Sequence, residues 1–98
     1  MAIPSNSSAR AFFARFPDGT SLRRSHASKV FTHAYLVLFE RPDGTHGFQR
    51  SFCQSWKEAR AKVEAEKQWL RENHHALVEA FIVKAGELKR AVRRKPPR

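Results

Sequence analysis

The chain has 98 residues, and its 19 lysines and arginines against nine aspartates and glutamates give a formal net charge of +10 at pH 7. This length suits one domain with a single modest core, and the charge predicts attraction to a polyanion, which is nucleic acid, an anionic membrane surface or an acidic protein face. A lone cysteine excludes an internal disulfide, and without a long apolar run or leader we expect a cytoplasmic protein with no membrane partner.

Composition along the chain predicts three parts. Residues 1–10 are polar and rich in turn formers, so we expect a flexible N-terminal arm. Residues 11–88 carry the apolar patterns and form a single α+β domain. Six of the ten residues at 89–98 are basic and none is acidic, which is typical of a disordered cationic tail.

The tetrapeptide Pro-Asp-Gly-Thr occurs twice, at residues 17–20 and 42–45. Proline presets φ at the first turn position, and glycine accepts the left-handed conformation that closes a type I turn with a bulge. Runs rich in aromatic and β-branched residues flank both copies. Each copy therefore predicts a β-hairpin.

Side-chain alternation divides the first hairpin into two faces. Pairing Phe16 with Thr20 gives an apolar face of Phe12, Ala14, Phe16 and Leu22. The opposite face then carries Phe13, Arg15, Ser21, Arg23 and Ser25.

The same reasoning applied to the second hairpin, with Arg41 paired to Thr45, predicts one face of Leu36, Leu38, Phe48 and Phe52. Tyr35, Val37 and Phe39 lie on the other face. A strand that is apolar on both faces is either a central strand covered on both sides or part of an interface.

A helical pattern follows the second hairpin. Ser55 and Glu58 form a capping box, and the apolar spacing predicts a helix from residue 55 to about residue 73. Residues 76–84 fit either a helix or a strand, and their β-favouring composition favours the strand. We therefore predict an antiparallel sheet of four to five strands built from two hairpins and packed against a helix in the C-terminal half.

No pattern of catalytic or metal-binding residues is found. The five histidines and Cys53 lack the paired spacing of a structural zinc site. Cys53 has no evident base and orienting group beside it, and there is no glycine-rich phosphate loop. We expect a protein that is not an enzyme and that has no cofactor.

The segment from Tyr35 to Glu72 carries a strand, a turn with Asp43-Gly44, a strand ending in Phe52 and a helix opening Lys57-Glu58-Ala59. It resembles the AP2-like arm-binding domain of tyrosine recombinases, a three-stranded antiparallel sheet with a C-terminal helix behind it. In that family the sheet enters the major groove. The resemblance implies DNA contacts by Arg41, Gln49 and Arg50.

We therefore predict a small basic nucleic-acid-binding protein, with DNA favoured over RNA. Arginines bind phosphates through paired donors, and a basic tail adds salt-sensitive affinity. Besides the three residues implied by the resemblance, the expected contacts are Arg10, Arg15, Arg23, Arg24, Lys29, Arg90, Arg93, Arg94 and Lys95.

The alternative is a small phage- or mobile-element-encoded inhibitor, similar to anti-CRISPR proteins, that binds a host nucleic-acid-handling complex. Its protein interface, or a homodimer seam, would use aromatic and apolar side chains. The candidates are Tyr35, Val37, Phe39 and Trp69.

Overall fold

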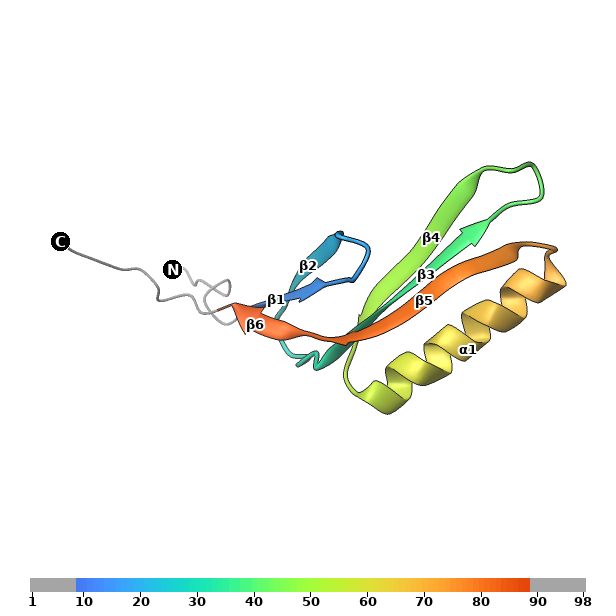
Figure 1. Ribbon diagram of the computed structural model, residues 1–98. Helices are drawn as coiled ribbons and strands as arrows, with labels where there is room; N and C mark the ends of the chain where they lie inside the picture. Colours follow the sequence, from blue (N-terminus) through green and yellow to red (C-terminus); the bar gives the residue numbers. More distant parts are fainter. Residues whose placement is uncertain (1–8, 89–98) are drawn as a thin grey trace, which may run out of the picture.

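The computed structural model describes residues 9–88, which form six strands and one helix in an α+β arrangement (Figure 1). Of the predicted arm at 1–10 and tail at 89–98, only Ala9 and Arg10 fall within the described residues. The elements are β1 (Arg10–Arg15), β2 (Ser21–His26), β3 (His33–Glu40), β4 (His46–Cys53), α1 (Trp56–Glu72), β5 (Ala76–Lys84) and β6 (Gly86–Leu88).

The strands form two antiparallel sheets of three strands each, in the orders β2-β1-β6 and β4-β3-β5. The prediction of one sheet of four to five strands is therefore wrong in its arrangement. The two hairpins do not pair with each other; each pairs with a different part of the final strand segment. β5 lies beside β3, and β6 lies beside β1 after the interruption at Ala85 (Figure 1). The choice of a strand for residues 76–84 is confirmed.

Both Pro-Asp-Gly-Thr turns close as predicted. The Phe16 amide donates to the Thr20 carbonyl at 2.9 Å, and the Arg41 amide donates to the Thr45 carbonyl at 2.7 Å. Gly19 and Gly44 have φ values of 96° and 89°, in the region that side chains rarely adopt. These turns fix the register of both hairpins, so the predicted faces are confirmed.

Helix α1 begins after Ser55, whose Oγ accepts a 3.0 Å hydrogen bond from the Glu58 amide. The Glu58 carboxylate in turn accepts from the amide of Gln54, one residue earlier than a standard capping box requires. The helix buries Ala59, Val63 and Leu70 against the β4-β3-β5 sheet. Among residues 9–88, no helix is long and apolar enough to cross a membrane.

Strand β3 is buried on both faces, because the helix covers one side and the first hairpin covers the other. The core on the hairpin side contains Phe12, Ala34, Leu36, Phe52 and Phe31. Phe31 comes from the β2–β3 connection. Its ring stacks on Phe52 with centroids 5.3 Å apart and meets Phe12 edge-on at 5.2 Å.

Candidate nucleic-acid interface

The outer face of the β2-β1-β6 sheet points away from the core. Phe13 lies at its centre, paired with Arg23 on β2 and with Gly86 on β6. Arg15 pairs with Ser21 at one end of the face. We call this surface the arginine face; its members are Ala11, Phe13, Arg15, Ser21, Arg23, Ser25, Gly86 and Leu88.

The local sequence explains why this side of the first hairpin faces solvent. Phe12, Ala14 and Phe16 alternate with Phe13 and Arg15, and burial follows the same alternation. Phe12 is 1% exposed, whereas its neighbour Phe13 is 39% exposed. The strand thus places Phe13 and Arg15 on the solvent side because its other side forms the core.

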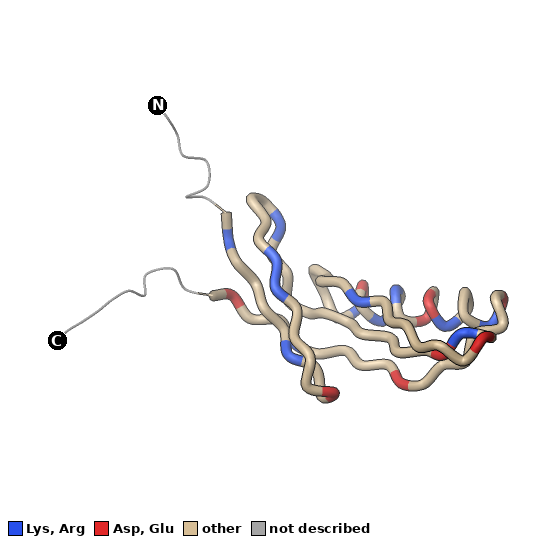
Figure 2. Tube along the Cα trace, turned by 90° about the horizontal axis from the view of Figure 1, so that it is seen from above, with Lys and Arg blue, Asp and Glu red and all other residues tan. Residues whose placement is uncertain are grey.

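The net charge of the described chain is confined to the first hairpin and the connection that follows it. Residues 9–30 contain five basic residues and one acidic residue, whereas residues 31–88 contain eight of each. Basic positions gather on the hairpin in Figure 2, while both signs alternate along the helix. One end of the molecule is therefore positive and the rest is balanced.

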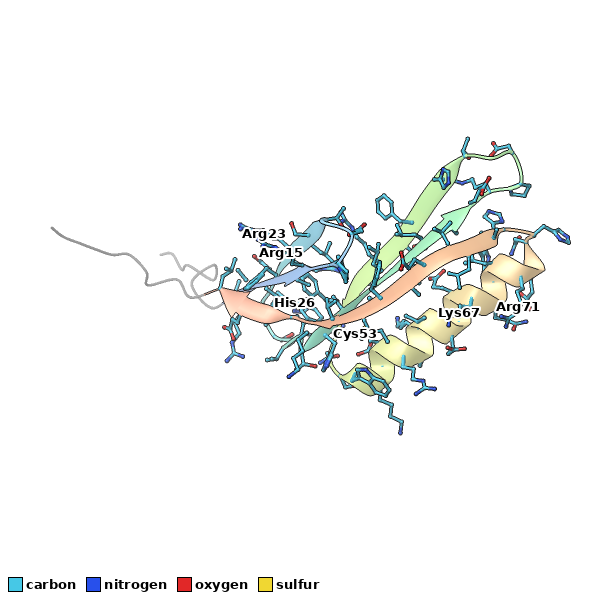
Figure 3. All side chains as sticks on the ribbon, in the orientation of Figure 1. Arg15, Arg23, His26, Cys53, Lys67 and Arg71 are labelled. Carbon is cyan, nitrogen blue, oxygen red and sulfur yellow. The ribbon has the colours of Figure 1, made fainter. Side chains whose placement is uncertain are left out.

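Arg15 and Arg23 lie close to each other on this hairpin (Figure 3). Within residues 9–88 the two ion pairs are Arg10 with Glu87 at 3.7 Å and Lys67 with Glu64 at 3.5 Å, so neither arginine of the face is neutralised by a carboxylate. A shallow hollow of about 340 Å³ adjoins Arg23 and is lined in part by Ser25 and Leu88.

The other predicted contacts near the hairpin do not share the arginine face. Arg24 pairs with Phe12, and Arg10 pairs with His26, so the register gives both to the opposite side of the sheet. Arg10 is also engaged by Glu87. Lys29 lies in the β2–β3 connection, where its amide donates to Nδ1 of His26 at 3.1 Å.

The structure does not bring together the three residues that the resemblance implied. Arg41 holds the second turn, donating to the His46 carbonyl at 2.9 Å. Gln49 and Arg50 are neighbours on β4 and therefore lie on opposite faces of the sheet. Arg50 stacks on Phe48 at 5.0 Å and donates to the Ser21 carbonyl at 3.2 Å, linking the two hairpins.

Three of the four candidate protein-interface residues are buried. Tyr35, Val37 and Phe39 are 5%, 0% and 4% exposed, because α1 packs over them. Tyr35, Val37 and Phe39 are therefore core residues of the fold. This corrects the expectation that they form an accessible protein interface or homodimer seam. Trp69 is 47% exposed and packs edge-on against His75 at 5.0 Å.

The predicted tail contacts, Arg90, Arg93, Arg94 and Lys95, lie outside the described residues. Leu88 is the last residue of β6 and the last residue that the structure describes, and it pairs with Ala11 of β1. The basic segment 89–98 is thus joined covalently to the sheet that carries the arginine face.

Cys53 lies just before α1, where it is fully buried (Figure 3). Burial raises the pKa of its thiol, and the nearby charge of Glu58 raises it further. A high pKa disfavours the thiolate that nucleophilic chemistry needs. Within residues 9–88, no three histidine, cysteine or acidic side chains gather into a group that could hold a metal ion.

The two members of the arginine face that β6 contributes, Gly86 and Leu88, were not identified from the sequence. They join the face only because β6 pairs with β1, and the three residues of β6 are too few to show a strand period. A long-range pairing of this kind leaves no signal in a single sequence. The nearest hint is Gly86 itself, since an isolated glycine in an apolar stretch often marks a close approach.

The segment that resembles an AP2-like domain contains most of β3 together with β4 and α1, whereas the third strand of that sheet, β5, follows the helix and lies beyond the segment. Comparison of the sequence and structure with protein-family models, curated proteins and solved structures gave no match.

Proposed function

We propose that the protein binds nucleic acid through the arginine face. The observation that carries this proposal is the charge distribution: residues 9–30 hold the whole charge excess of the described chain, and Arg15 and Arg23 on the outer face have no carboxylate partner within it. A guanidinium offers paired donors that match the oxygens of a phosphate.

Several features around these arginines support phosphate contact. Ser21 and Ser25 share the face and can donate short hydrogen bonds to backbone oxygens. The basic segment 89–98 follows β6 directly in the chain and adds six positive charges. Such charge attracts a polyanion from a distance and supplies affinity that falls as salt rises.

The test compares two full-length double variants that lose the same charge. Arg15→Gln with Arg23→Gln removes both guanidinium groups from the arginine face. Lys57→Gln with Lys62→Gln removes two exposed lysines from α1. Affinity for labelled DNA and RNA oligonucleotides is measured by fluorescence anisotropy at several salt concentrations.

We expect the arginine variant to bind at least ten-fold more weakly at low salt. Its salt dependence should also be smaller, by about 0.7–0.9 in log–log slope for each phosphate that the variant no longer neutralises. The lysine variant should retain most of the wild-type affinity. Equal losses in both variants would mean that total charge, and not the arginine face, governs binding. Undetectable binding by the wild type would exclude the proposed function.

A further inference from the structure

Phe13 is an aromatic side chain in the middle of a basic surface. It stands two residues from Arg15 on β1 and directly opposite Arg23 on β2, and 39% of its surface is exposed. Exposing a phenylalanine at the centre of a sheet face leaves part of its apolar surface in water. What distinguishes Phe13 is its position, because its exposed ring lies among the basic side chains of the arginine face.

Gly86 determines how the ring of Phe13 lies. A Cβ atom at Gly86 would stand 2.8 Å from Cε1 and 3.0 Å from Cζ of Phe13, closer than real contacts allow. Because Gly86 has no side chain, the ring of Phe13 can lie across β6 instead of pointing away from the sheet. One side of the ring consequently lies against the backbone of β6, on the solvent-facing surface of the sheet.

The other exposed aromatic side chains in the described residues are already engaged. Arg50 stacks on Phe48 at 5.0 Å, Arg60 stacks on Trp56 at 5.4 Å, and His75 packs against Trp69. Phe13 has no aromatic or cationic partner within residues 9–88. Its ring is therefore available to a ligand.

We propose that the arginine face binds single-stranded nucleic acid, with an unpaired base stacked on Phe13 and the adjacent phosphates bound by Arg15 and Arg23. This inference rests on the proposed function and names its substrate class. Stacking on an aromatic platform combined with a basic surface is the general mode of single-strand recognition, and it tolerates any base because every base has a π-face. A duplex cannot use Phe13 in this way, because its bases are already stacked on each other.

The test changes the ring but keeps its apolar cover over Gly86. Phe13→Leu retains an apolar side chain without a π-face, and Phe13→Trp restores an aromatic face. The probes are a labelled oligothymidylate and a labelled DNA duplex of mixed sequence, each titrated with full-length protein at the same ionic strength. Thermal unfolding of each variant checks that the fold is retained.

We expect Phe13→Leu to weaken binding of oligothymidylate by about ten-fold or more, a reduction typical of one stacked base. Its affinity for the duplex and its salt slope should match those of the wild type, because the phosphate contacts remain. Phe13→Trp should restore binding of the single strand.

Wild-type affinity of Phe13→Leu for oligothymidylate, or an equal reduction for both probes, would overturn the inference. Either result leaves the proposed function standing if Arg15→Gln with Arg23→Gln still weakens binding. Absence of wild-type binding to both probes would instead reject the proposed function itself.

Discussion

Asp18 and Asp43 occupy the same place in the two repeated turns and make the same contacts. Each carboxylate accepts a 2.7 Å hydrogen bond from the hydroxyl and a 3.0 Å bond from the amide of the threonine two residues later. The hydroxyl bond is the main reason that the pKa of each aspartate lies below its ordinary value. The repeated tetrapeptide thus encodes both the turn and the side-chain contact that stabilises it.

This hydrogen bond predicts that the free energy of unfolding depends on pH in the acidic range. Because the folded pKa of Asp43 lies below the unfolded value, its contribution is present above about pH 4 and is lost as the pH falls through the folded pKa. Asp43→Asn should reduce the slope of unfolding free energy against pH in this acidic range. Chemical denaturation at a series of pH values measures that slope.

Thr45→Val provides a matched variant for the same measurement. It keeps the carboxylate but removes the hydroxyl donor, so the folded pKa should move back toward its ordinary value and the slope should again fall. An unchanged slope in both variants would show that the hydrogen bond does not influence stability.

At the scale of elements, β1 gives the clearest contrast between its two faces. Phe12 is buried among Phe31 and Phe52, whereas the adjacent Phe13 is exposed. Phe12→Ala should cost roughly 3–5 kcal/mol of unfolding free energy, because it leaves a cavity in the core. Phe13→Ala should cost about 1 kcal/mol or less.

Urea denaturation of the two variants and the wild type measures both costs. The comparison is internally controlled, since the residue type and the substitution are the same at adjacent positions. Similar costs in the two variants would mean that the register of β1 is wrong, and the arginine face would then be assigned to the wrong side of the sheet.

The elements that the sequence predicted correctly depend on local signals. The Pro-Asp-Gly-Thr turns, the alternation through Phe12 and Phe13, and the serine cap at Ser55 each act within a few residues. The hairpin faces and the helix follow from them directly. The same alternation correctly placed Arg15, Arg23 and Phe13 together on one face.

What the sequence did not predict depends on contacts between distant segments. The division into two sheets follows from β5 and β6 pairing with different hairpins on either side of Ala85. The burial of Phe31 depends on rings contributed by β1 and β4. Tyr35, Val37 and Phe39 were identified as apolar, but whether a helix or a partner covers them is decided by tertiary packing.

At the scale of the whole molecule, the charge excess and the helix lie in different parts of the fold. The described residues extend over 53 × 30 × 24 Å, with the charge excess on the first hairpin and the helix on the far side of β3. A polyanion is thus attracted to one end of an elongated body. Residues 31–88, which include the helix and the second hairpin, carry equal numbers of basic and acidic residues.

The most direct test of the central claim is to map backbone amide chemical shifts by NMR while titrating the full-length protein with an oligonucleotide. The arginine face predicts that shifts gather on β1, β2 and β6, together with the basic segment 89–98, and that α1 changes little. Shifts confined to residues 89–98, or centred on α1, would contradict the assignment of binding to this face.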